Sequence, residues 1–257
     1  MSPHRFFLGA ALPEGDGPVE IPLADADRHH LADVARVRVG ERIAVVDPDG
    51  TAWEVEVSRV DRAGVEGLRL LRLDEDPAWR VTLVQGLAKG AKIDLVVEKT
   101  TEIGVEAVVP VLTARSVVRL DGEKTHDRGE RWRRVARAAA QQSQRSTIPR
   151  IHDPQPLAVF VEQIPAYDVV LVTAEDAADA PGVGEALASA GAHARSRIAV
   201  VVGPEGGMTP DEVRTLVDAG ALPVFLGRNI LRSETAGILA VALCVYEIGG
   251  LGGRSRG

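Results

Sequence analysis

The sequence predicts an α/β protein in which a mostly parallel β-sheet is flanked by helices. The first observation behind this prediction is a set of short, almost wholly apolar runs rich in β-branched residues, a pattern typical of strands that are covered on both faces. These runs are residues 81–88, 108–112, 169–172, 198–202 and 222–226. The second observation is that the last two runs each end in a glycine-bearing loop that leads into a helix.

The first of these loops is Gly-Pro-Glu-Gly-Gly at residues 203–207, in which three glycines leave little side-chain bulk. A helix is expected directly after it. Thr209 is the predicted N-cap, Pro210 takes the first helical position, and Glu212 completes a capping box. Gly220 is expected to end this helix. A pentapeptide of this kind, considered alone, is usually no more than a tight turn.

The second loop begins with Gly227-Arg228-Asn229 and leads into a final helix over residues 234–248 that is apolar on nearly all faces. Such a helix is either buried within one subunit or packed on a partner. Open α/β sheets bind ligands at the carboxyl ends of their strands, where helix N-termini and bare backbone amides gather. The pair of loops therefore predicts a ligand site. Neither the dinucleotide fingerprint nor the P-loop pattern occurs, so those nucleotide folds have no support.

Composition narrows the class of protein. The single cysteine, Cys244, excludes an internal disulfide and fits a reducing cytosol, so a cytoplasmic protein is expected. No long apolar stretch is present, and neither a signal peptide nor a membrane partner is expected. The six histidines show no metal-ligand spacing, and no metal is expected.

Charge is unevenly distributed along the chain. The net charge of −7 argues against nucleic acid, yet residues 115–150 hold ten Arg or Lys against four Asp or Glu. A basic segment in an acidic protein is the local electrostatic footprint of a nucleic-acid partner.

The N-terminal part reads as a small β-rich domain. Strands are predicted at residues 42–46, 51–60 and 68–73, with a short helix at 27–37. The acidic, proline-ended connector at 74–77 gives the predicted boundary between a domain of residues 1–73 and a domain of residues 74–257. Residues 149–165 are punctuated by proline and are expected to be irregular.

The residues of the two loops, GPEGG at 203–207 and LGRNILRSETA at 226–236, resemble the signature of the bacterial 16S ribosomal RNA (uracil-N3)-methyltransferases. These enzymes belong to the SPOUT, or trefoil-knot, class, and the resemblance covers the whole chain in order and length. Arg228-Asn229 stands where the family more often has Pro-Arg. The resemblance implies a SPOUT-like knotted sheet with an N-terminal PUA-like β-barrel that binds RNA. It also implies S-adenosyl-L-methionine as the cofactor, 16S rRNA or the small ribosomal subunit as partner, and a homodimer formed through the C-terminal helix.

The resemblance also assigns binding residues. Three loops would hold S-adenosylmethionine through bare backbone and a few apolar walls, and their residues are Thr173, Gly203, Glu205, Gly206, Gly207, Leu226, Gly227, Ile230 and Leu231. RNA contacts would come from Arg5, Arg36, Lys89, Lys92, Lys99, Gln142 and Arg145. For Arg5 and Arg36 a solvated surface role is an equal alternative. Lys92 and Lys99 lie seven residues apart and are expected together on the outer face of their helix.

Arg232 and Glu234 are the predicted catalytic residues. Methylation of uracil N3 requires loss of the ring proton, and a fixed cation such as Arg232 stabilises the resulting anion. Glu234 would orient Arg232 or accept the proton. In the alternative, Glu234 only stabilises the first turn of a helix whose N-cap is Ser233. Methylation at uracil carbon 5 would need a cysteine nucleophile, and Cys244 sits in an apolar run typical of a core.

Two other functions stay open at this point. One is a non-catalytic knotted RNA-binding module, and the other is a SPOUT methyltransferase that acts on the ribose 2′-hydroxyl of transfer RNA.

Overall fold

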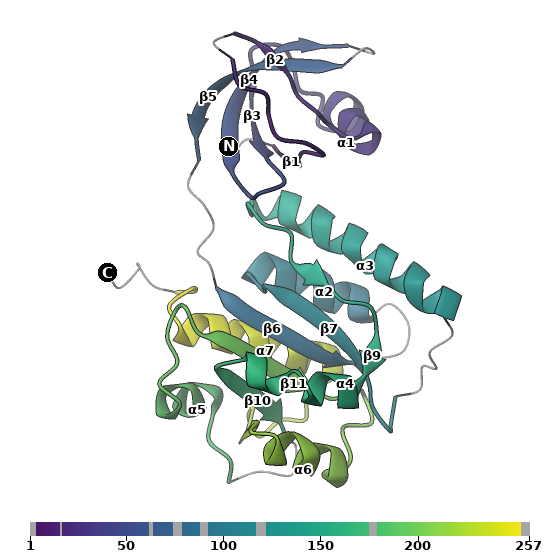
Figure 1. Ribbon diagram of the computed structural model, residues 1–257, viewed down its shortest axis with the longest axis vertical. Coiled ribbons are helices and arrows are strands. Elements are labelled where there is room, and N and C mark those ends of the chain that lie inside the picture. Colours follow the sequence, from purple (N-terminus) through teal and green to yellow (C-terminus); the bar gives the residue numbers. More distant parts are fainter. Residues whose placement is uncertain are drawn as a thin grey trace. The chain divides into compact units, whose positions relative to one another are not determined.

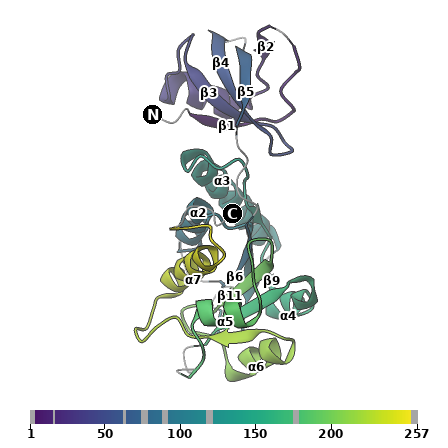
Figure 2. The same cartoon turned by 90° about the vertical axis from the view of Figure 1, so that its left-hand side faces the viewer.

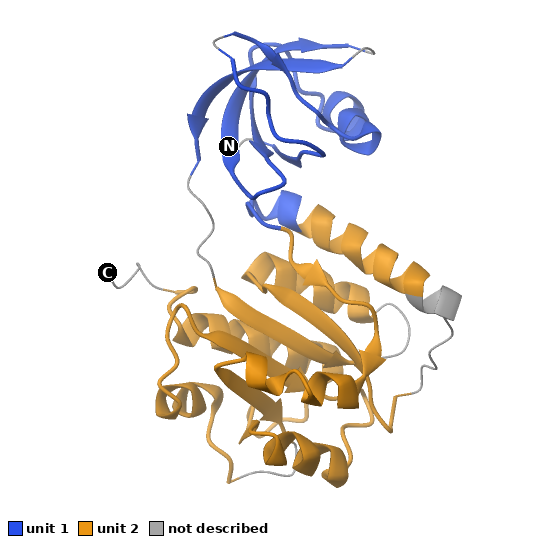
Figure 3. Ribbon diagram, in the orientation of Figure 1, with its two compact units in different colours: residues 1–76, 140–147 blue, residues 77–139, 148–257 orange. Residues whose placement is uncertain are grey.

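The structure, a computed structural model, describes residues 4–15, 17–61, 64–73, 79–87, 92–116, 122–174 and 179–252. The chain forms two compact units (Figure 3). One comprises Met1–Asp76 together with Ala140–Thr147, and the other comprises Pro77–Ala139 together with Ile148–Gly257. Each unit is described by itself.

The N-terminal unit is built on a five-stranded mixed sheet with the order β1-β3-β4-β5-β2 (Figure 1). Its strands are β1 (Arg5–Phe7), β2 (Val19–Glu20), β3 (Arg42–Val46), β4 (Ala52–Val60) and β5 (Val65–Arg72). The last three confirm the predicted strands. The amide of Gly9 donates a 3.2 Å hydrogen bond to the carbonyl of Pro22. This bond links the segments that follow the two edge strands, β1 and β2.

The helix predicted at residues 27–37 is divided. Helix α1 (Asp25–His29) continues into a π-helix, η1 (His30–Val34). The wider turn is closed by the Ala35 amide, which bonds to the carbonyl of His30 at 2.8 Å. Arg36 then takes a φ of 53° and stops the helix. Because the prediction assumed regular α geometry throughout, it placed this end three residues too late.

Residues 140–147 belong to the N-terminal unit and include the end of helix α3 (Gly122–Gln142). The Gln141 side-chain amide donates to the buried carboxylate of Asp27 at 3.0 Å. The amides of Gln144 and Arg145 bond back to the carbonyls of Gln141 and Ala140, at 3.4 and 3.0 Å. This is a Schellman ending in which Gln144, with a φ of 62°, takes the left-handed position that glycine usually occupies.

The C-terminal unit contains a seven-stranded sheet with the order β12-β10-β11-β6-β7-β8, and β9 also pairs with β7. All of these pairings are parallel. The strands are β6 (Arg80–Gly86), β7 (Ala107–Leu112), β8 (Arg150–Ile151), β9 (Gln155–Pro156), β10 (Val169–Thr173), β11 (Arg197–Val202) and β12 (Leu222–Val224). Each of the five apolar runs forms a strand, as predicted.

Residues 149–165 are more ordered than predicted. They form β8, β9, helix α4 (Leu157–Val161) and the 3-10 helix η2 (Ile164–Ala166). The prediction was wrong because prolines disfavour central strands but are tolerated in short edge strands, where few ladder hydrogen bonds are needed.

Helices cover both faces of this sheet (Figure 2). On one face α2 (Lys92–Ile103), α3, α5 (Val183–Ser189) and α7 (Ser233–Glu247) share a core with Leu83, Leu171 and Val200. On the other face α4, η2 and α6 (Pro210–Asp218) pack against Val84 and Val172. Neighbouring strand residues thus enter different cores, which explains why the runs are continuously apolar.

The two C-terminal helices follow the sequence closely. Helix α6 has the predicted capping box: the Glu212 amide donates to Thr209 Oγ1 (3.2 Å), and the Thr209 amide donates to Glu212 Oε2 (2.8 Å). In α7 the Cys244 side chain is fully buried, and burial raises the pKa of its thiol to about 12. Among the described residues, no helix has the length and hydropathy needed to cross a membrane.

Candidate active site

The carboxyl ends of four neighbouring strands meet at one edge of the parallel sheet. Thr173 on β10 is level with Val224 on β12, and Val202 on β11 is level with Gln85 on β6. Residues predicted to hold the cofactor follow directly: Thr173 ends β10, and Gly203 comes after β11. The structure therefore brings the three predicted loops to the same edge.

The loop at 203–207 is packed tightly against β6. A Cβ placed on Gly86 would lie 2.4 Å from the nitrogen of Pro204, so only glycine permits this approach. Gly207 has a φ of 67°, in the region that favours glycine. On its outer side the loop is held by Arg115, whose Nη1 donates to the carbonyl of Gly206 at 2.9 Å. The result is a fixed turn with exposed backbone.

The loop that follows β12 is more open. Gly227 has a φ of 128°, and a Cβ built there would meet no atom within 4 Å. Leu226 and Leu231 are half-buried, whereas Ile230 is 93% exposed. Of the three predicted apolar wall residues, Ile230 is the one that this structure does not pack against other side chains.

Arg232 takes the N-cap position of α7, with extended backbone angles and no capping hydrogen bond from its side chain. Ser233 was expected there and is instead the first helical residue. Its hydroxyl is used elsewhere, since it donates to the carbonyl of Gly203 at 2.6 Å and accepts from Gln85 Nε2 at 2.9 Å. Arg232 is exposed, and within the described part of the chain its guanidinium has no acidic partner. It is therefore available to an anion.

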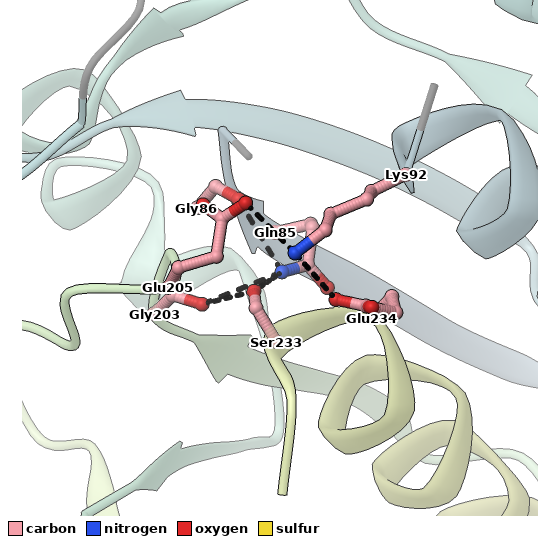
Figure 4. A network of polar contacts seen from close by, with 7 residues as sticks. All are labelled: Gln85, Gly86, Lys92, Gly203, Glu205, Ser233 and Glu234. Atoms are coloured by element: carbon pink, nitrogen blue, oxygen red, sulfur yellow. Dashed lines mark hydrogen bonds and ion pairs between the residues drawn. The ribbon is translucent and has the colours of Figure 1, made fainter. Parts of the chain in front are cut away.

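Glu234 lies in the first turn of α7 with only 9% of its surface exposed. Its Oε2 is 3.4 Å from Lys92 Nζ, which also contacts Glu205 Oε1 at 3.0 Å (Figure 4). The hydrogen bond that Lys92 donates to Glu205 is the main reason that the pKa of Lys92 is raised, and Glu234 adds to it. Lys92 thus lies between two carboxylates. Glu205 belongs to the predicted cofactor loop, and Glu234 belongs to the predicted catalytic start of α7.

The other predicted RNA contacts fall in both units. Arg5, Arg36, Gln142 and Arg145 lie in the N-terminal unit, where Arg36 and Gln142 are exposed. Lys99 lies on α2 with Glu98 and Glu102 each 2.8 Å from its ammonium, and the hydrogen bond to Glu102 is the largest cause of its raised pKa. Lys89 lies outside the described residues.

A basic cavity accompanies helix α3 in the C-terminal unit. Its volume is about 700 Å³, and it opens between the helix and residues 148–153. Four arginines line it: Arg133, Arg134, Arg137 and Arg150. Arg133 is paired with Glu130 and Asp153. This surface agrees with the basic segment seen in the sequence.

Two residues of the site were missed from the sequence. Arg115 supports the 203–207 loop, and Gln85 is completely buried beneath it. Gln85 carried a signal, because a lone polar residue inside an apolar strand must find a hydrogen-bond partner when it is buried.

Comparison with known proteins agrees with this architecture. Residues 74–245 match the family described as RNA methyltransferase domain, and residues 23–67 match the RNA methyltransferase PUA domain. Ribosomal RNA small subunit methyltransferase E of Mycobacterium bovis is 37% identical, covering 86% of this chain and 84% of its own length. The Bacillus subtilis protein of the same name is 29% identical over 95% of this chain and 96% of its own length.

A solved structure extends the likeness. The crystal structure of ribosomal RNA small subunit methyltransferase E from Neisseria gonorrhoeae, bound to S-adenosyl methionine, has a TM-score of 0.82 and 29% identity over 96% of this chain and 98% of its own. Fold and site thus define an RNA methyltransferase with a SPOUT-type sheet and a PUA-like unit, which confirms the predicted fold class. The chain belongs to the ribosomal RNA small subunit methyltransferase E family.

Proposed function

We propose that this chain transfers a methyl group from S-adenosylmethionine to N3 of a uridine in 16S rRNA of the small ribosomal subunit. The observation that carries the proposal is the meeting of two kinds of segment at one sheet edge: glycine loops with bare backbone, and the helix start that holds Arg232 and Glu234. Family membership, with relatives that match both parts of the chain, supports the same reaction.

The residues present fit the cofactor. Gly86 lies so close to the 203–207 loop that a side chain there is excluded, a Cβ on Gly203 would lie only 3.1 Å from the backbone of Gly207, and Gly207 and Gly227 take positive φ angles. Such loops expose amides and carbonyls that suit the adenosine and the amino-acid part of S-adenosylmethionine, while Leu226 and Leu231 supply apolar contact. When bound, this cofactor supplies an electrophilic methyl group carried on a sulfonium.

The side chains at the start of α7 would act on the nucleobase. The guanidinium of Arg232 is exposed and would stabilise the anion formed when uracil N3 loses its proton. Glu234, held next to Lys92, would accept that proton or fix Arg232. The buried thiol of Cys244 is not a nucleophile, because burial holds it protonated. This favours a nitrogen acceptor over carbon 5.

The remaining assignments belong to the same proposal. Residues 1–73 form the RNA-binding domain, with Arg5 and Arg36 as contacts, and residues 74–257 form the methyltransferase domain. Gln142, which ends the basic helix α3, and Arg145, which follows that helix, also contact the RNA. Two chains pair through α7, on which Tyr246 is 56% exposed next to the exposed Glu247. The enzyme acts in the cytoplasm, where small ribosomal subunits are found.

The test is methyl transfer with labelled S-adenosylmethionine, using naked 16S rRNA and assembled small subunits in parallel. Digestion to nucleosides followed by mass spectrometry should give 3-methyluridine. Arg232→Ala should lower kcat by about a hundredfold or more while the unfolding curve is unchanged, since one electrostatic contact to a developing anion is worth about that much. A 2′-O-methylated nucleoside, or no product, would refute the proposed reaction.

A further inference from the structure

Two donors in the site bridge the same pair of segments. The first is Gln85, at the end of β6. Its Nε2 donates to Ser233 Oγ at 2.9 Å and lies 3.5 Å from the carbonyl of Gly203, which also accepts from the Ser233 hydroxyl (Figure 4). This bridge is buried, and it ties the beginning of the 203–207 loop to the beginning of α7.

The second donor is Lys92, at the start of α2. Its ammonium reaches Glu205 in the same loop and Glu234 in the same first turn of α7, at 3.0 and 3.4 Å. The side chain is 34% exposed, so this bridge lies nearer the solvent than that of Gln85. Residues from two different elements thus converge on one junction.

We propose that Gln85 and Lys92 are positioning residues that together clamp the cofactor loop to the catalytic end of α7. The inference rests on the proposed function, because it gives the clamped segments their roles. In this arrangement Lys92 serves the junction and not an RNA phosphate.

Charge explains why Lys92 is needed at this junction. Glu205 and Glu234 both lie within 3.4 Å of one ammonium, so without it two carboxylates would face each other. An ammonium carries one positive charge, and here two carboxylate oxygens, Glu205 Oε1 and Glu234 Oε2, lie 3.0 and 3.4 Å from it. A phosphate would have to compete with both for the same cation.

Packing explains why Gln85 is fixed. A Cβ placed on Gly237, one turn into α7, would lie 2.2 Å from Gln85 Oε1. The side chain of Gln85 therefore rests against the backbone of α7, and only glycine at position 237 allows this. Loop and helix are held as one body, so a disturbance at either bridge should reach both segments.

The decisive variant is Lys92→Met, with Lys92→Arg as a rescue and Lys99→Met as the matched control. Lys99 is on the same helix and also lies between two carboxylates, but away from the junction. Three quantities should be measured: hydrogen exchange of the ligand-free protein, the affinity for S-adenosylmethionine, and kcat with the KM for RNA.

Lys92→Met should speed amide exchange severalfold in residues 203–209 and also in 232–236, since loss of the bridge lowers the cost of local opening. It should weaken cofactor affinity and lower kcat by about tenfold or more, because small misplacements of reacting groups are costly. The KM for RNA should stay within about twofold, as Lys92 makes no phosphate contact. Lys92→Arg should restore most of the loss, and Lys99→Met should leave exchange and cofactor affinity unchanged. Ser233→Ala, which removes the buried bridge, should change exchange in the same two segments.

Two results would overturn the clamp. In one, Lys92→Met raises the KM for RNA and reduces its salt dependence while exchange and cofactor affinity are unchanged, which would make Lys92 a phosphate contact. In the other, Lys92→Met and Ser233→Ala alter none of the measured quantities. A wild-type protein that transfers no methyl group would refute the proposed function instead, and the exchange data would still test the clamp.

Discussion

Replacing Gly86 with alanine should break the contact on which the cofactor loop depends. The added methyl group would lie 2.4 Å from Pro204 N and 2.7 Å from Gly203 C, about 1 Å inside ordinary contact distance. Both neighbours are backbone, so the end of β6 must move away from β11. Overpacking of this kind costs about 1–3 kcal/mol. Loss of a nearby hydrogen bond, such as that from Gln85 to Ser233, adds about 1 kcal/mol.

A smaller contribution offsets part of this loss. Alanine restricts the unfolded chain more than glycine does, which stabilises the folded protein by about 0.4–1 kcal/mol. The net expectation for Gly86→Ala is a loss of about 1–3.5 kcal/mol in the free energy of unfolding. Urea denaturation measures this directly, and titration calorimetry should show weakened binding of S-adenosylmethionine. Gly17→Ala is the control, because a Cβ on Gly17 meets no atom within 4 Å. A Gly86→Ala protein with unchanged stability and cofactor affinity would show that β6 and the loop are not in contact.

Three further outcomes are expected. Thr209→Ala removes the capping hydrogen bond to Glu212 and should cost about 1 kcal/mol in urea denaturation, while an unchanged midpoint would contradict the capping box. Gln144→Gly should stabilise by about 0.5–1 kcal/mol, because glycine takes the positive φ without strain, and Gln144→Ala should not. Hydrogen bonds from Arg197, first from its side chain and second from its backbone amide, hold the pKa of Asp168 below its usual range. The charged carboxylate therefore stabilises the fold above about pH 4, and this contribution is lost as the pH falls through the lower pKa of the folded state. Stability measured against pH should therefore fall less steeply in acid for Asp168→Asn, and parallel curves would exclude the contribution.

Most of the C-terminal sheet was predictable because its strands are buried on both faces. Val172 and Leu171 enter different cores, so each run had to be apolar at every position, and length separated these runs from helices. The capping box at Thr209 was predictable for a related reason: both partners lie within four residues. Patterns formed by residues close in sequence determine the local structure without help from distant parts of the chain.

Other features depended on choices that sequence patterns do not encode. The π-helix over His30–Val34 differs from an α-helix by one residue in its hydrogen-bond spacing, and periodicity over so short a stretch cannot resolve that difference. The short strands β8 and β9 exist because they add to the edge of β7. Their own residues favour irregular structure, and they become strands because β7 offers backbone hydrogen bonds to them.

The clearest limit is the contrast between Lys92 and Lys99. Seven residues is close to two helical turns, so the spacing placed both side chains on one face of the helix, and the family resemblance assigned both to RNA. Lys99 meets carboxylates of its own helix, whereas Lys92 meets Glu205 and Glu234, which lie more than a hundred residues further along the chain. Helical periodicity fixes the direction in which a side chain leaves its helix, but not what another element brings to that point. The same holds for Gln85, whose partner Ser233 is 148 residues away. The side-chain contacts of this site are therefore decided by which strands end, and which loops and helices begin, at the same edge of the sheet. The topology determines this arrangement, and no single strand or helix encodes it.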